Sequence, residues 1–181
     1  MEYQVKRSRF IAFADHTKGI KSAKSFLHKL KANFPDARHH CYGFVAGHPN
    51  ESSLYGFSDD NEPSGTAGMP IFTHLKHSGI GEISVVVVRY FGGTKLGTGG
   101  LARAYSEATK QVLEKLETSV FIETKKIVIS CDFASEAGVR NKIKSVKGSV
   151  VNVKYLDNVK LTCLVPVNCE LNLPYSVNSS A

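Results

Sequence analysis

The chain contains 181 residues, 42% of them hydrophobic and 22% charged, which is the balance of an ordinary globular protein with its own core. No apolar run approaches the ~20 residues of a membrane-spanning helix, and the opening residues lack a secretory-signal pattern, so we expect a cytoplasmic protein without a membrane span. The cysteines form no CxxC pair, which argues against a zinc ribbon and favours reduced packing thiols at Cys41, Cys131, Cys163 and Cys169.

The net charge of +7 is unevenly distributed along the chain. Residues 1–40 contain nine Lys and Arg against three acids, whereas residues 51–62 contain four acids and no base. A basic excess permits attraction to phosphate-rich partners but does not establish it, because many basic proteins bind no nucleic acid.

The first third of the chain predicts a strand, a helix and a hairpin. Residues 6–16 mix basic and apolar side chains, as is typical of an opening strand. Thr17 is a candidate cap for a helix that stops at Pro35. Residues 38–47 and 53–60 then alternate as two strands. The predicted helix has an apolar stripe of Ile20, Ala23, Leu27, Leu30 and Phe34, and an opposite face of Lys18, Lys21, Lys24, Lys29 and Lys31. We interpret this lysine face as solvated surface, with contact to RNA as the alternative.

The middle of the chain predicts a helix, a buried strand and a second helix. Thr66 can cap a short helix that accommodates Pro70 in its first turn and ends at Gly79. Residues 83–90 form a continuous β-branched run, which indicates a strand buried on both faces. From Gly100 onward a helical stripe runs through Leu101, Tyr105, Ala108, Val112 and Leu116.

The pattern restarts near Thr118, which predicts two domains, residues 1–118 and 119–181. Residues 127–131 alternate as a strand, Ser135 can cap a helix to residue 146, and strands follow at 151–155 and 159–165. This β-α-β-β order is the first part of a ferredoxin-like unit. The closing segment has two prolines and no helical stripe, so we expect that unit to lack its last helix and strand.

Five glycines in nine positions, residues 92–100, follow the predicted buried strand. This loop fails the phosphate-binding Walker pattern, and its G-x-G-x-x-A stretch lacks the strand context of a dinucleotide site. Backbone N–H groups at the start of the next helix nevertheless favour an anion, so the loop predicts contact with phosphate or RNA. The alternative is that the glycines only let the loop fold closely over the sheet. The candidate anion-binding residues are Arg89, Lys95, Gly97, Thr98, Gly99 and Gly100.

Two other motifs suggest chemistry without specifying it. The run Arg38–Cys41 places too few ligands on each strand face for a metal, and we favour histidines that hydrogen-bond to the acidic loop. That loop, residues 57–68, lacks the order of a calcium-binding hand and does not fix two carboxylates as a catalytic pair. A structural or partner-binding loop is the preferred interpretation. Thr66 precedes a predicted helix, whose first backbone N–H groups again favour an anion. We therefore assign no catalytic residue, metal or cofactor.

Three stretches taken together, RHHCYGFVAG, FSDDNEPSGTAGMP and VVVVRYFGGTKLGTGGLARAY, resemble the signature of the IMPACT family, in particular its bacterial YigZ-type members. The resemblance is strongest over residues 6–118. The family usually has Gly where Asn61 stands, and Asn also tolerates positive φ. Besides Arg89, Gly97, Gly99 and Gly100, the matching signature residues are Arg38, His39, His40, Ser58, Asp59, Asp60, Glu62, Pro63, Gly65, Thr66, Ala67, Gly68, Tyr90, Gly92 and Gly93.

The resemblance implies an α+β chain. Its N-terminal β-α domain would resemble the second domain of a small-subunit ribosomal protein, and a truncated ferredoxin-like domain would follow. It also implies a non-enzymatic factor linked to translation, with the ribosome, RNA or a protein as its partner. Fold alone does not fix function, so two alternatives stay open. One is an enzyme or sensor that binds a phosphorylated small molecule at the glycine loop, and the other is a protein-binding module that uses the acidic loop.

Overall fold

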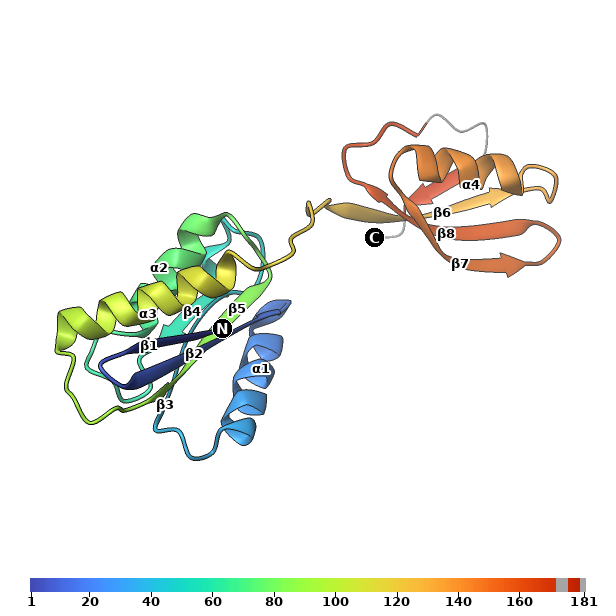
Figure 1. Ribbon diagram of the computed structural model, residues 1–181. Coiled ribbons are helices and arrows are strands. Elements are labelled where there is room, and N and C mark those ends of the chain that lie inside the picture. The colour runs from blue at the N-terminus through green and yellow to red at the C-terminus, as the bar shows by residue number, and fades with distance from the viewer. Residues whose placement is uncertain (172–175, 180–181) are drawn as a thin grey trace. The chain divides into compact units, whose positions relative to one another are not determined.

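The valine-rich strand β5 (Ile83–Tyr90) lies at the centre of a five-stranded antiparallel sheet in the order β1-β2-β5-β3-β4 (Figure 1). The computed structural model describes residues 1–171 and 176–179, with side chains for 1–171. Every residue of β5 except Tyr90 is buried, as the sequence predicts. Its neighbours are β2 (Ser8–His16) and β3 (His39–Val45), and the edges are β1 (Glu2–Val5) and β4 (Tyr55–Ser58).

Helices cover both faces of this sheet, which explains why β5 has no polar face. Helix α1 (Gly19–Asn33) packs on the side of Val86 and Val88. Helices α2 (Gly68–Ser78) and α3 (Thr98–Leu113) lie on the opposite side, over Val85 and Val87 (Figure 1). None of the helices in the described part of the chain has the length and apolar character that crossing a membrane requires.

The first hairpin departs from the sequence prediction. Residues 2–5 pair with 8–11, so a two-residue turn at Lys6 and Arg7 joins β1 to β2. Both turn residues have positive φ, 46° and 65°. Asn-Gly is the usual sequence signal for such a turn, and its absence hid the short strand β1. A single 3-10 turn, η1 (Ser52–Leu54), precedes β4 and shortens the predicted strand at 53–60.

None of the three hydroxyl side chains predicted to cap a helix makes a capping hydrogen bond. The Thr17 hydroxyl lies 2.6 Å from the Ser84 hydroxyl in the interior, and α1 begins two residues later. The Thr66 hydroxyl donates to the Pro63 carbonyl at 2.6 Å, and α2 begins at Gly68. Ser135 occupies the cap position of α4 (Glu136–Ser145) without a side-chain cap bond. Each hydroxyl has a competing partner or orientation that sequence does not reveal.

Residues 119–181 form a second compact unit, separate from Met1–Thr118, with its own four-stranded sheet. The strand order is β7-β8-β6-β9, and α4 connects β6 to β7. Alternate residues of β8, from Val159 to Val165, face α4 and form this unit's core with Ile129 and Ile143. The bounds are β6 (Thr124–Cys131), β7 (Ser149–Tyr155) and β8 (Val159–Pro166).

The expectation that the last strand is missing was wrong. Strand β9 (Ser176–Ser179) pairs antiparallel with Ile127–Ser130 at the edge of the sheet. An edge strand needs only backbone pairing, so a short polar stretch forms it without the alternation that predicts strands. No helix occurs in residues 167–171, and the remaining part of the expected helix position, 172–175, lies outside the described residues.

Candidate functional site: the glycine loop and the buried network beneath it

The predicted signature motifs meet at a buried ion pair between Glu62 and Arg89. Glu62 lies on the loop between β4 and α2, and Arg89 is the next-to-last residue of β5. The Arg89 Nη1 and Glu62 Oε1 atoms are 2.5 Å apart, and the two side chains are 7% and 3% exposed. Arg89 Nε is buried and has no hydrogen-bond partner among the residues that the structure describes. The pair joins the acidic loop to the end of the central strand.

Tyr105 and Cys41 extend this pair into a network. The Tyr105 hydroxyl donates to Glu62 Oε1 at 2.9 Å, and the Cys41 thiol lies 3.2 Å from the Tyr105 oxygen. Burial raises the pKa of both Tyr105 and Cys41, so both groups keep their protons at neutral pH. A protonated buried thiol is a poor nucleophile. The network is therefore suited to fixing geometry rather than to covalent chemistry.

Asp59 caps helix α2 from a distance. Its Oδ1 accepts hydrogen bonds from the backbone N–H groups of Ala67 and Gly68 at 2.9 and 2.8 Å, and its Oδ2 accepts from Gly65 at 2.9 Å. Burial opposes ionisation of Asp59, but these three donors lower its pKa below the ordinary value. The backbone N–H groups that follow Thr66 therefore do bind an anion, and that anion is the carboxylate of Asp59.

The histidines contact the acidic loop, as the sequence analysis preferred. His39 Nδ1 lies 3.0 Å from the Asp60 carbonyl, and the His40 backbone N–H donates to Asp60 Oδ2 at 2.7 Å. Lys31 from α1 also binds Asp60, at 2.9 Å. Asn61 has φ 68°, so the turn that glycine would favour survives there. Asp59, Asp60 and Glu62 are all engaged internally, which leaves little free charge in this loop for a partner.

The glycine loop is mostly exposed, with Gly92, Leu96 and Gly100 half-buried. Gly97, with φ 71°, precedes the first residue of α3 and provides no side-chain cap for that helix. Lys95 and the stretch Gly97–Gly99 are exposed, so the N–H groups of the first turn of α3 face no side-chain acceptor in the described chain. A Cβ atom on Gly99 would lie 3.6 Å from the Arg103 guanidinium, which places that cation beside the helix start.

Arg89 does not lie where the sequence placed it. It was expected to flank the loop as an anion contact, but its guanidinium is buried beneath the loop and already paired with a carboxylate. Its alternation along β5 turns it inward, onto the same face as Val87. Arg103, one helical turn after Gly99, is the exposed cation that sequence reasoning missed, and its spacing from the glycines is the signal that could have identified it.

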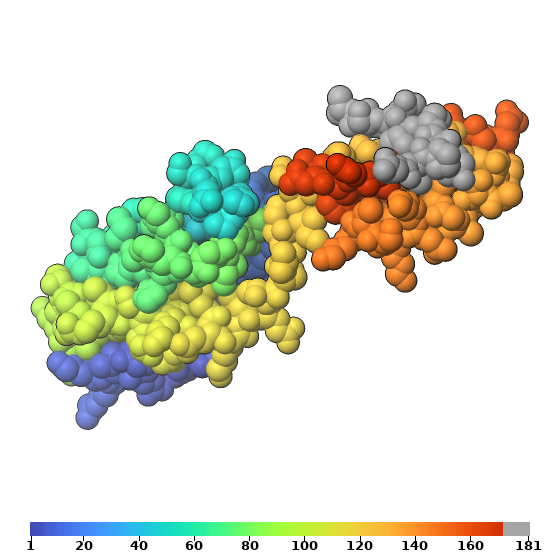
Figure 2. All heavy atoms as spheres, turned by 90° about the horizontal axis from the view of Figure 1, so that it is seen from above, coloured from blue at the N-terminus to red at the C-terminus, as the bar shows by residue number. Residues whose placement is uncertain are grey.

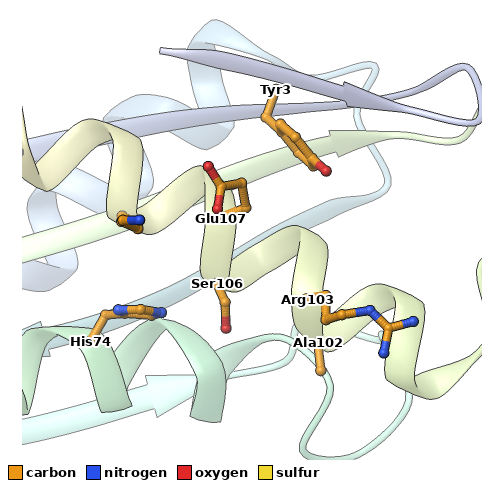
Figure 3. A pocket seen from close by; sticks show the side chains of 7 residues that line it. Tyr3, His74, Ala102, Arg103, Ser106 and Glu107 are labelled. Atoms are coloured by element: carbon orange, nitrogen blue, oxygen red, sulfur yellow. The ribbon is translucent and has the colours of Figure 1, made fainter.

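A shallow surface hollow of about 580 Å³ follows the outer face of α3 (Figure 3). Arg103, Ser106 and Glu107 project into it from α3, and His74 from α2 and Tyr3 from β1 form its sides. Burial lowers the pKa of His74, so this imidazole is mainly neutral at pH 7. The hollow begins at the same Arg103 that lies beside the start of α3.

The other signature residues surround these contacts. Gly92 and Gly68 allow close backbone approach, because a Cβ atom there would lie 2.0 Å from Arg7 and 2.5 Å from Ser58. Gly65 and Gly93 have positive φ. The Tyr90 hydroxyl donates to Asp36 on the α1 side. Ser58 accepts from the Asp60 N–H, Ala67 is buried, and Arg38, Pro63 and Thr98 are exposed.

Comparisons with known proteins give the same assignment as these motifs. The family model of the Impact N-terminal domain matches residues 6–113. The IMPACT family member YigZ of Escherichia coli is 42% identical over 163 residues, which cover 90% of this chain and 80% of that protein. YvyE of Bacillus subtilis is 34% identical over 91% of this chain and 75% of its own. A crystal structure described only as that of a hypothetical protein superposes with a TM-score of 0.69 and 42% identity, covering 92% of this chain and 81% of that one. The chain therefore belongs to the IMPACT family, as a YigZ-type protein.

Proposed function

We propose that this protein is a non-enzymatic, translation-associated factor that binds RNA on the ribosome through the exposed glycine loop, residues 91–100. The main support for this proposal is a difference between the N-termini of helices α2 and α3. Asp59 fills the N-terminus of α2, whereas the N-terminus of α3 ends in exposed glycine backbone beside Lys95 and Arg103. Positive helix ends and flanking cations favour a phosphate.

The buried network supports a binding role over a catalytic one. Its thiol and phenol are protonated, and its only carboxylate is neutralised by Arg89. These groups hold the ends of the loop in place without offering a nucleophile or a free base to a substrate. The network therefore supports a rigid platform beneath the loop.

The folds of the two units are consistent with this proposal by analogy. In the described part of residues 119–181 the strand order is β7-β8-β6-β9, with helix α4 after the first strand, which supports a ferredoxin-like unit. We extend the proposal to the N-terminal unit as a relative of the β-α domain of a small-subunit ribosomal protein. These two resemblances concern the fold alone, so the proposed function rests on the chemistry of the glycine loop.

Co-sedimentation with purified ribosomes and separated subunits, across a salt series, tests the proposal. The site variant is Lys95→Ala with Arg103→Ala, and the matched control is Lys144→Gln with Lys147→Gly, which removes two exposed cations from the second unit. We expect saturable binding to one subunit, with a salt slope that the site variant flattens by about 1.4 to 1.8 and the control leaves unchanged. Identical salt-dependent loss for all three proteins contradicts the proposal.

The hollow beside α3, which Lys110 also lines, supports a second candidate, a phosphorylated small molecule held by Arg103 and Lys110. Thermal-shift titration with inorganic phosphate, nucleotides and sugar phosphates tests it. A saturable shift that Arg103→Ala abolishes supports this candidate, and the absence of any saturable shift contradicts it.

A further inference from the structure

The turn between β1 and β2 consists of two basic residues in a backbone conformation that is unfavourable for both. Lys6 and Arg7 both adopt positive φ, at 46° and 65°, where Asn-Gly is the favoured pair. Both side chains are exposed, and neither has a carboxylate partner among the residues that the structure describes. The next basic residue of the hairpin, Arg9, is paired with Glu2. The turn therefore displays unneutralised charge at a conformational cost.

This turn lies directly against the glycine loop. The Gly92 N–H donates to the Ser8 hydroxyl at 3.1 Å, and a Cβ atom on Gly92 would lie only 2.0 Å from the Arg7 carbonyl carbon. The pairing of β2 with β5 explains the contact, because Arg9 is opposite Tyr90 at the end of both strands. In Figure 2 the blue atoms of this hairpin adjoin the yellow-green atoms of the segment that follows β5.

Phe91, which immediately precedes Gly92, provides an aromatic surface next to the segment that contacts the turn. It is 54% exposed, although it follows a buried strand. The Arg89 guanidinium carbon lies over its ring, 5.7 Å from the centroid, and is 5.5 Å from the centroid of Phe10. The buried ion pair thus holds Arg89 in a position that orients the exposed Phe91 ring. A half-exposed aromatic ring on a segment that contacts a basic turn is suited to stacking with an unpaired base.

We propose that Phe91, Lys6 and Arg7 form a subsite for single-stranded RNA, in which one base stacks on Phe91 and the neighbouring phosphates contact the basic turn. The inference rests on the proposed function and specifies its ligand. Stacking requires an unpaired base, because a duplex hides the faces of its bases. The ligand is therefore a loop or a free end rather than a helix.

Fluorescence anisotropy with a labelled 12-nucleotide RNA, single-stranded or annealed to its complement, tests the subsite in the full chain. The first variant is Lys6→Asn with Arg7→Gly, which removes both charges and gives the turn its favoured residues. The second is Phe91→Leu, which keeps an apolar side chain and removes the ring. Lys144→Gln with Lys147→Gly is the charge-matched control, and it also relieves a positive φ, 59° at Lys147.

We expect the single strand to bind more tightly than the duplex. The turn variant should weaken that binding by about tenfold and flatten its salt slope by about 1.4. The same variant should melt about 2–4 °C higher, so lost binding cannot be attributed to unfolding. Phe91→Leu should weaken single-strand binding by about tenfold and leave duplex binding unchanged.

Equal binding of duplex and single strand, with no effect of Phe91→Leu, would contradict the subsite. The proposed function would still stand if the variant of Lys95 and Arg103 loses affinity. Binding that falls equally in the turn variant and the control overturns the subsite as well. No saturable binding by the wild type to either RNA, together with no ribosome binding, overturns both.

Discussion

Glu62 and Arg89 form a buried ion pair that connects the acidic loop to the central strand of the N-terminal unit, with Tyr105 as a second donor to the same carboxylate oxygen. Removal of one partner leaves a buried charge uncompensated. Arg89→Met should therefore destabilise the protein by about 3–5 kcal/mol, whereas Glu62→Leu with Arg89→Met should recover most of that loss.

Urea unfolding followed by tyrosine near-UV circular dichroism measures this effect, because five of the seven tyrosines lie in residues 1–118. Arg9→Met is the control, since the Arg9 side chain is 48% exposed in its pair with Glu2. The urea midpoint of this control should barely change. Equal losses in the single and double variants would show that packing, not charge, makes the pair necessary.

Asp59 should make the stability of the N-terminal unit depend on acid. Its native pKa lies below the ordinary 3.8, so its contribution is present above pH 3.8 and is lost as pH falls through the lower native value. Asp59→Asn should cost about 1–2 kcal/mol near pH 7 and progressively less below about pH 4. Urea midpoints between about pH 7 and pH 3 measure this, with exposed Asp15→Asn as the control. A gap between wild type and Asp59→Asn that does not change with pH contradicts the capping role of the charge.

Adjacent glycines in the loop should respond differently to alanine. A Cβ atom at Gly92 meets the backbone of Arg7 at 2.0 Å, whereas one at Gly93 meets nothing within 4 Å and only strains a φ of 84°. Gly93→Ala should cost about 1–2 kcal/mol, and Gly92→Ala should cost more, because β1, β2 and the loop must separate. Thermal melting of the two variants compares them directly, and equal losses would mean that the contact with Arg7 is readily relieved.

The cysteines should differ sharply in reactivity. Cys41, Cys131 and Cys163 are buried, whereas Cys169 is partly exposed. Burial also raises the pKa of Cys41, Cys131 and Cys163, which lowers the thiolate fraction that reacts. Titration with a thiol reagent should modify one cysteine rapidly in the native protein and the others only in denaturant. Cys169→Ser should remove the rapid phase, and rapid labelling of Cys41 contradicts the buried network.

The sequence predicted the strongly periodic parts of this fold and missed the parts that depend on distant contacts. The central strand Ile83–Tyr90 and the stop of α2 at Gly79 follow from local composition and are confirmed. The Asp59 cap was not predictable, because its acceptors and donors are six to nine residues apart and meet only when the loop folds. Strand β9 was missed because backbone pairing alone forms it.

For the candidate site as well, local sequence patterns were predictable and contacts between distant residues were not. Of the candidate loop residues, Lys95, Gly97, Thr98 and Gly99 are exposed and Gly100 is half-buried, and their role in binding stays a prediction. The burial of Arg89 was not predicted, because its partner Glu62 is 27 residues away in the chain and reaches Arg89 only when the acidic loop folds. The basic turn was missed because Lys-Arg is an unfavourable sequence for its backbone, which is the kind of local conflict expected at functional positions.

Hydrogen–deuterium exchange of the full chain, with and without saturating purified ribosomes, tests most directly whether the glycine loop and the basic turn form the binding surface. We predict slower exchange in peptides that cover residues 5–9 and 91–101, with no change in residues 139–147, where the control cations Lys144 and Lys147 lie. Protection confined to other segments, with residues 91–101 exchanging at the same rate in both samples, would show that the glycine loop is not the binding surface.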